Sequence, residues 1–124
     1  MKILSTDKAP AAIGPYSQGV WHGDLLFLSG QIPIDPATQG VVAGEIEAQT
    51  RRVLDNIGAV LAEAGLTFGH VIKTTVFLDD LADFKRFNEV YALYFREHKP
   101  ARSTVQAAAL PRAVKVEIEV IAGR

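Results

Sequence analysis

The chain contains no cysteine at all, and only one tryptophan and one methionine among its 124 residues. Without cysteine it has no disulfide, no thiolate metal ligand and no cysteine nucleophile. A chain of this length buries roughly two thirds of the surface of its unfolded state, so an apolar core alone is sufficient for folding. The absence of cysteine is also compatible with a reducing compartment.

An excess of charge and long apolar runs are missing as well. The chain has 13 Lys and Arg residues and 14 Asp and Glu residues, which gives a net charge of -1. This balance gives no electrostatic reason to expect nucleic acid or an anionic membrane as a partner. No apolar run is long enough to span a bilayer, and the start "MKILSTDKAPAAIGPY" lacks the pattern of a signal peptide. We therefore expect a soluble, cytoplasmic protein.

No internal repeat, low-complexity tract or linker divides the sequence, so we expect a single domain over residues 1–124. The stretch "VWHGDLLFLSG" predicts two short strands joined by a turn at His22, Gly23 and Asp24. The following "QIPIDPATQG" is interrupted by proline and glycine and predicts a loop.

Two later segments have helical periodicity. Between residues 45 and 64 apolar side chains recur every three or four positions, and Gly65 is suited to end this helix. Asp79 or Asp80 can cap a second helix, which Pro100 prevents from continuing. One stripe of the second helix is aromatic and consists of Phe84, Phe87, Tyr91, Tyr94 and Phe95.

Residues 70–78, 102–108 and 113–122 are rich in β-branched side chains and predict further strands. The order of elements indicates an α+β or α/β domain, with a small mixed sheet and two helices packed on one face. No third layer is left to cover the other face, toward which either Leu26 and Leu28 or Leu25 and Phe27 point. An uncovered apolar sheet face indicates an interface, so we expect a homo-oligomer.

Few residues form a recognisable catalytic pattern by themselves. His22, His70 and His98 lack the spacing of metal ligands, so no metal site is expected. The glycines of "GPYSQG" form neither a dinucleotide-binding fingerprint nor a phosphate-binding loop, and no nucleotide cofactor is expected.

Glu117 gains interest from the expected oligomer. It shares a strand face with Lys115 and Glu119, a pattern that in an isolated domain is typical of a solvated face. If subunits bury this face, the carboxylate of Glu117 needs hydrogen bonds or a cation. Arg102 begins the strand that we expect to lie beside it, and is the candidate partner within a shared pocket.

Seven motifs occur in order along the chain: "GPYSQG", "LSGQIP", "LDNI", "KTTVFLDDLADF", "FNEVYALYF", "PARSTV" and "KVEIEVIA". Over essentially the whole chain they resemble the RidA/YjgF family of reactive intermediate imine deaminases. The resemblance implies a chorismate-mutase-like fold and a homotrimer whose sheets face inward, with active sites between subunits. It also implies hydrolysis, without metal or cofactor, of 2-aminoacrylate, 2-iminopropanoate and 2-iminobutanoate, which pyridoxal-phosphate-dependent dehydratases release, to 2-oxo acids and ammonia.

The resemblance also assigns roles to individual residues. Arg102 of "PARS" would bind the substrate carboxylate, for which the planar fork of arginine is well suited. Glu117, the first glutamate of the "VEIE" strand, would hold the attacking water. By the same match, the pocket would be completed by Tyr16, Ser29, Gly30, Asn88 and Thr104.

Thr104 departs from the family pattern, because many relatives have cysteine at this position. A thiol-dependent role does not transfer to this chain, whereas a contact through the backbone does. Two alternatives to the deaminase stay open at this point: an endoribonuclease that inhibits translation, and a non-enzymatic role in small-ligand binding or as a holdase chaperone. The sequence also leaves open the preferred imino acid and whether Glu117 acts first as base or as acid.

Overall fold

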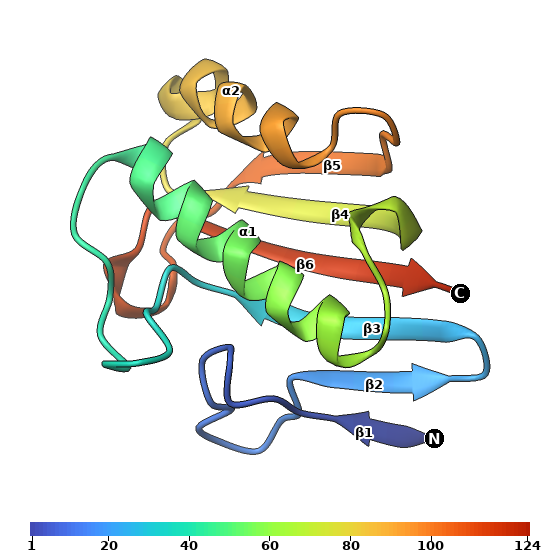
Figure 1. The fold of residues 1–124 in the computed structure, drawn as a ribbon. Helices are drawn as coiled ribbons and strands as arrows, with labels where there is room; N and C mark the ends of the chain where they lie inside the picture. Colours follow the sequence, from blue (N-terminus) through green and yellow to red (C-terminus); the bar gives the residue numbers. More distant parts are fainter.

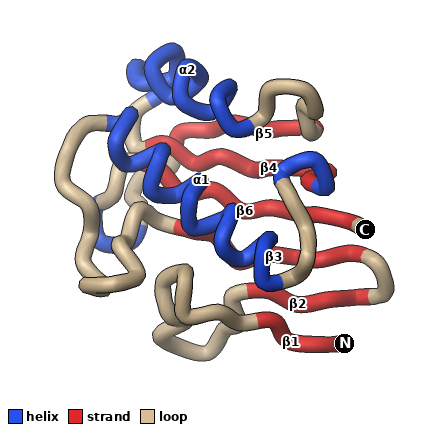
Figure 2. The backbone as a smooth tube through the Cα atoms, in the orientation of Figure 1, coloured by secondary structure: helices blue, strands red, loops and turns tan.

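The computed structural model describes residues 1–124 and contains one six-stranded sheet with two α-helices on the same side of it (Figure 1, Figure 2). The strand order is β1-β2-β3-β6-β4-β5. Only β4 and β5 pair in parallel, so the sheet is mixed, and the predicted arrangement is confirmed. The elements are β1 (Lys2–Leu4), β2 (Gly19–His22), β3 (Leu25–Gln31), α1 (Ile46–Glu63), β4 (Val71–Leu78), α2 (Phe84–Tyr94), β5 (Ala101–Gln106) and β6 (Val116–Gly123).

The two helices begin and end for local reasons. Helix α1 ends where Gly65 adopts a φ of 76°, a left-handed conformation that glycine accepts without steric cost. Helix α2 begins at Phe84, later than the capping residues predicted. Asp80 instead accepts a hydrogen bond from the backbone N–H of Ala82 at 2.9 Å and caps a short 3-10 turn, Leu81–Asp83, that precedes the helix.

The core lies between the helices and one face of the sheet. Leu26 and Leu28 of β3 point into it and are buried, whereas Leu25 and Phe27 point to the other face and are 38% and 42% exposed. This decides between the two alternatives that the sequence left for β3. The second face, here called the open face, has no helix over it (Figure 2) and carries exposed apolar side chains.

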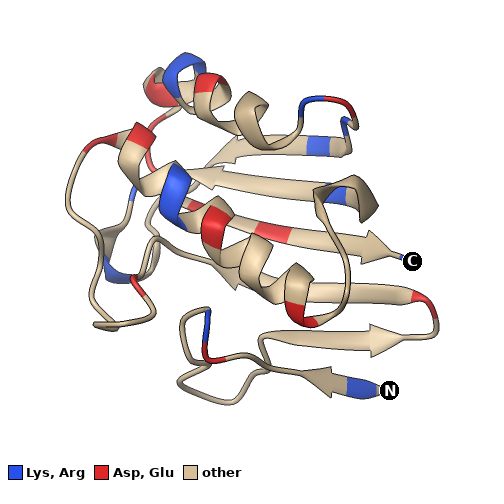
Figure 3. Cartoon of the chain, in the orientation of Figure 1, with Lys and Arg blue, Asp and Glu red and all other residues tan.

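Charged residues of both signs are distributed over helices, strands and loops (Figure 3). No stretch of the ribbon collects basic side chains alone. Neither helix combines the length and the apolar character that a membrane crossing would require.

Candidate functional site

Arg102 lies on the edge strand β5, on the face of the sheet that the helices cover. Its strand partner in the parallel pair is Thr74 of β4, which is fully buried. The guanidinium Nη1 donates a hydrogen bond of 2.8 Å to Oδ1 of Asn88 on α2. Its central carbon lies 5.4, 5.9 and 4.8 Å from the ring centres of Phe84, Phe87 and Tyr91, respectively.

Arg102 is a cation without an anionic partner in its own chain. No Asp or Glu carboxylate forms an ion pair with Arg102 within the chain. The aromatic ring faces attract the guanidinium without neutralising it. A guanidinium has five N–H donors, of which Asn88 uses one. The group is therefore held in place and still able to bind a carboxylate through two parallel hydrogen bonds.

Glu117 lies on β6 and faces the opposite side of the sheet. Its antiparallel partner is Phe77 of β4, on the open face. Burial raises the pKa of the Glu117 carboxyl above its ordinary value, and the nearby charge of Glu119 raises it further. No Lys or Arg forms an ion pair with Glu117 within the chain. A carboxyl group whose protonated form is favoured in this way is a candidate general acid–base group.

Gly30 provides the space in which the Glu117 carboxylate lies. The register of β3 and β6 shifts between Leu28 and Gln31, where Ser29 and Gly30 form a β-bulge. A Cβ atom on residue 30 would overlap with Oε2 of Glu117. The present position of the carboxylate therefore depends on glycine at position 30.

Ser29 connects the same bulge to the loop that contains Tyr16. Its hydroxyl donates a 2.6 Å hydrogen bond to the carbonyl oxygen of Ser17, and its backbone N–H donates to the carbonyl of Gln18 at 3.0 Å. Tyr16 itself stays 53% exposed. In this chain, Ser29 therefore holds the Tyr16 loop against β3.

One cavity of about 700 Å³ brings together four of the predicted site residues: Tyr16, Ser29, Gly30 and Glu117. Apolar side chains from the loops on either side of β3 form much of its wall, including those of Ile13, Ile32 and Ile34. The cavity thus combines two carboxylates (Glu117 and Glu119), the guanidinium of Arg112, hydroxyl groups and an apolar surface. Polar groups set in an apolar wall are typical of a site for a small organic ligand.

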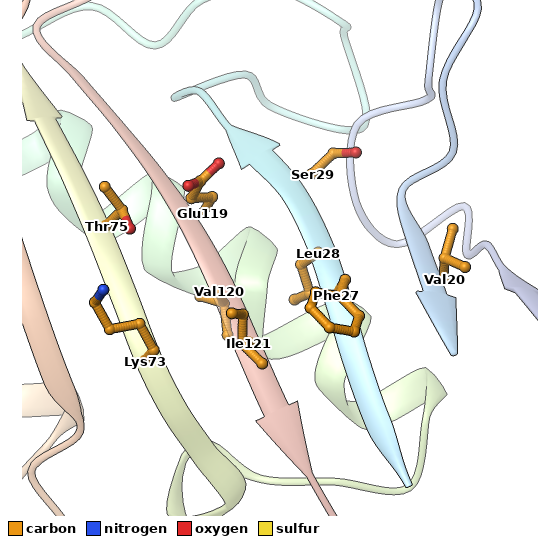
Figure 4. Close-up of a pocket in the computed structure, with 9 residues that line it drawn as sticks. All are labelled: Val20, Phe27, Leu28, Ser29, Lys73, Thr75, Glu119, Val120 and Ile121. Atoms are coloured by element: carbon orange, nitrogen blue, oxygen red, sulfur yellow. The ribbon is translucent and has the colours of Figure 1, made fainter. Parts of the chain in front are cut away.

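A second hollow, of about 470 Å³, lies on the open face across β2, β3, β6 and β4 (Figure 4). It shares Ser29 and Glu119 with the first cavity. Lys73 on β4 and Glu119 on β6 line this hollow on neighbouring strands, and Phe27 lies on β3, on the other side of β6 (Figure 4). The cavity at Glu117 is thereby adjacent to the exposed apolar face of the sheet.

Arg102 and Glu117 do not lie on neighbouring strands, and the sequence-based expectation is wrong on this point. Within one chain, Arg102 does not line the cavity at Glu117. The strand beside β6 on that side is β4, which separates it from β5. The two side chains also point to opposite faces, because the partner of Arg102 is the buried Thr74 and the partner of Glu117 is Phe77 on the open face.

The predicted site residues therefore fall into two groups. Asn88 and Thr104 accompany Arg102 on the helix-covered face, and the Oγ1 atom of Thr104 is buried without a hydrogen-bond partner. No group of three His, Asp or Glu side chains is arranged to hold a metal ion.

The sequence did not reveal that the aromatic stripe of α2 receives Arg102, although the spacing of the stripe was visible. No pattern in the sequence indicated that the isoleucines of the cavity wall would line a site.

Comparison with known proteins extends over nearly the full chain. The family model described as Endoribonuclease L-PSP matches residues 6–123. Protein DfrA from Myxococcus xanthus is 57% identical over 123 residues, covering 98% of this chain and 94% of DfrA. A 2-iminobutanoate/2-iminopropanoate deaminase from Salmonella typhimurium is 52% identical over 126 residues, covering 99% and 98% of the two chains. The structure of Escherichia coli TdcF with bound serine has a TM-score of 0.95 at 50% identity, covering 100% of this chain and 99% of TdcF.

Proposed function

Because the chain belongs to the RidA/YjgF family, we propose that it hydrolyses small 2-imino acids, and the enamines that tautomerise to them, to 2-oxo acids and ammonia. The substrates would be 2-iminopropanoate and 2-iminobutanoate released by pyridoxal-phosphate-dependent dehydratases. The Salmonella relative that carries the name of this activity supports the reaction. The serine bound to TdcF supports a ligand with a carboxylate beside a nitrogen-bearing carbon.

The observation that carries the proposal is the separation of two complementary groups. Arg102 has no anionic partner, Glu117 has no cationic partner, and they face opposite sides of the sheet. We infer that the active site forms between copies of the chain in a homotrimer, in which Arg102 of one copy borders the Glu117 cavity of the next. The open face, with Phe27 at 42% exposure, is the surface that such an assembly would bury.

The reaction then needs only these two charged groups. Arg102 binds the carboxylate and fixes C2 of the imine, and ideal positioning of this kind supplies about 7–11 kcal/mol of barrier lowering. Water adds through its oxygen to C2, while Glu117 takes a proton from the water and passes it to the nitrogen. Glu117 next takes the hydroxyl proton of this carbinolamine and passes it to the amine. The C–N bond breaks, ammonia leaves, and C2 becomes a carbonyl carbon.

The test is a coupled assay in which a dehydratase generates 2-iminobutanoate and the formation of 2-oxobutanoate is followed. We expect Arg102→Lys to lower kcat/KM about 100-fold, because lysine keeps the charge but loses the bidentate geometry. Arg96→Lys, the same change at an exposed position after α2, is the control and retains full activity. Thermal denaturation of each variant verifies that the fold is intact.

A parallel arm with single-stranded RNA examines the activity named in the family model. Imine hydrolysis that depends on Arg102, without RNA cleavage, supports the proposal. Full imine hydrolysis by Arg102→Lys contradicts the role of Arg102. The absence of acceleration by the unmodified protein contradicts the function itself.

A further inference from the structure

Two buried hydroxyl groups meet directly beneath Arg102. The Oγ1 atom of Thr74 lies 2.8 Å from the phenol oxygen of Tyr91. Thr74 is fully buried and Tyr91 is 8% exposed. Thr74 is also the residue of β4 that stands in register with Arg102 on β5. The hydrogen bond therefore connects α2 to the sheet at the position of the guanidinium.

The ring of Tyr91 is the closest of the aromatic rings around Arg102. Its centre lies 4.8 Å from the central carbon of the guanidinium. The same ring packs against Phe87 at 5.4 Å and Phe95 at 4.6 Å between ring centres. The χ2 torsion of an aromatic side chain has broad minima, so rotamer preference alone does not fix the plane of the ring. The hydrogen bond from the ring oxygen to Thr74 adds a fixed point that packing alone does not supply.

The Thr74–Tyr91 pair is a poor choice if stability alone is required. The neighbouring residues of β4 that face the helices are apolar, including Val76 and Leu78. Burying a hydroxyl costs free energy that a single neutral hydrogen bond only about balances. Burial also raises the pKa of Tyr91, so the phenol stays neutral and does not become a counter-ion for Arg102. The pair instead fixes the position of the Tyr91 ring against Arg102.

We propose that Thr74 is a positioning residue, which through Tyr91 holds the plane of the Arg102 guanidinium in the orientation that binds a carboxylate bidentately. Asn88 holds one nitrogen of the group, and the Tyr91 ring supports its face. Neither Thr74 nor Tyr91 needs to touch the substrate. This inference rests on the proposed role of Arg102 as the carboxylate-binding residue.

The experiment measures binding of 2-oxobutanoate, a carboxylate product, by calorimetry on the assembled protein, together with kcat and KM for 2-iminobutanoate. Thr74→Val keeps the shape of the side chain and removes its hydroxyl, and Tyr91→Phe keeps the ring and removes the partner hydroxyl. We expect each to raise Kd and KM about fivefold, the ratio that corresponds to one neutral hydrogen bond, with kcat unchanged. Thr74→Ser retains the hydroxyl and restores both values.

A double-mutant cycle separates positioning from a general structural effect. In an Arg102→Lys background, Thr74→Val has no further effect on Kd, because an ammonium group has no plane to orient. Additive effects of the two changes would overturn the inference. So would wild-type binding by Thr74→Val and Tyr91→Phe.

The outcome for Arg102→Lys distinguishes this inference from the proposed function. If Arg102→Lys binds weakly and Thr74→Val binds as the unmodified protein does, the positioning role fails and the function stands. If Arg102→Lys also binds normally, the proposed role of Arg102 fails, whereas the function itself fails if the unmodified protein does not accelerate imine hydrolysis. Should Thr74→Val not fold, Tyr91→Phe, which retains the ring packing with Phe87 and Phe95, decides the question alone.

Discussion

Arg102 and Glu117 lie on opposite faces of the same sheet, with strand β4 between their strands. In the proposed assembly, each contributes half of a site. The half at Arg102 offers a cation held by Asn88 and aromatic rings, and the half at Glu117 offers a carboxylate in a cavity. We propose that a second copy of the chain completes the pocket, so we expect activity to depend on assembly.

The first prediction concerns Gly30. In Gly30→Ala the added methyl group displaces the Glu117 carboxylate, which lies at the end of a flexible side chain and can move without unfolding the protein. We expect kcat to fall about 100-fold, within the range associated with one misplaced acid–base group, while the melting temperature changes little. The measurement is the coupled imine assay with thermal denaturation.

Gly69→Ala is the matched control, because residue 69 lies in a short 3-10 turn remote from Glu117, where a Cβ comes no closer than 3.4 Å to other atoms. It should retain activity. Full activity in Gly30→Ala would show that the position of the carboxylate is unimportant.

Asn88→Asp gives Arg102 a counter-ion within its own chain. The new carboxylate would lie 2.8 Å from Nη1, where the amide oxygen is now, and would compete with the carboxylate of the substrate. We expect KM to rise roughly 10- to 100-fold, as for loss of a charged hydrogen bond, without loss of thermal stability. Leu93→Asp adds the same charge at an exposed position of α2 and should leave KM unchanged. An unaltered KM in Asn88→Asp would contradict the proposal that Arg102 binds the carboxylate of the substrate.

Thr104→Val removes a buried hydroxyl that has no hydrogen-bond partner. Since an unpaired buried hydroxyl is costly, we expect the free energy of unfolding to increase by about 1 kcal/mol. Activity should be retained, because the proposed contact of residue 104 is made by its backbone. Chemical denaturation and the imine assay measure both effects. A loss of activity would instead show that the hydroxyl contacts the ligand.

The raised pKa of Glu117 predicts how stability depends on pH. The folded state holds the proton more tightly than the unfolded state, so this group favours folding below its ordinary pKa of 4.5. That contribution is lost as the pH rises through the raised pKa. Glu117→Gln removes this dependence, so its melting temperature, relative to the unmodified protein, should increase between pH 4 and pH 7. Glu63→Gln, at an exposed position of α1, controls for the loss of a negative charge. A difference that is constant with pH would contradict the burial of the carboxylate.

Local patterns were sufficient to predict the elements that have a strong period. The helix expected over residues 45–64 is α1, Ile46–Glu63, because the spacing of its apolar residues is a local property. The three-residue strand β1, Lys2–Leu4, was not predicted, since it is too short to show a pattern and depends on pairing with β2. The α+β architecture was predicted, and the RidA/YjgF resemblance supplied its chorismate-mutase-like fold, which the similarity to solved structures confirms.

The arrangement of the site could not be predicted from the sequence, because it depends on non-local pairing. Strand β6 inserts between β3 and β4, which no local pattern indicates. The parallel register of β4 and β5 then decides that Arg102 faces α2 together with Thr74. For the same reason, the aromatic stripe with Tyr91 could be predicted as core but not as the support of a cation.

Mixing two inactive variants examines the intersubunit site itself. Arg102→Ala lacks the cation and Glu117→Gln lacks the carboxylate, so each alone should be inactive in the imine assay. After the two are unfolded together and refolded at equal concentrations, a site that takes Arg102 from one copy and Glu117 from the next is complete in about a quarter of random combinations. We therefore predict recovery of about a quarter of the unmodified activity. Mixed trimers without any recovered activity would contradict a site shared between chains.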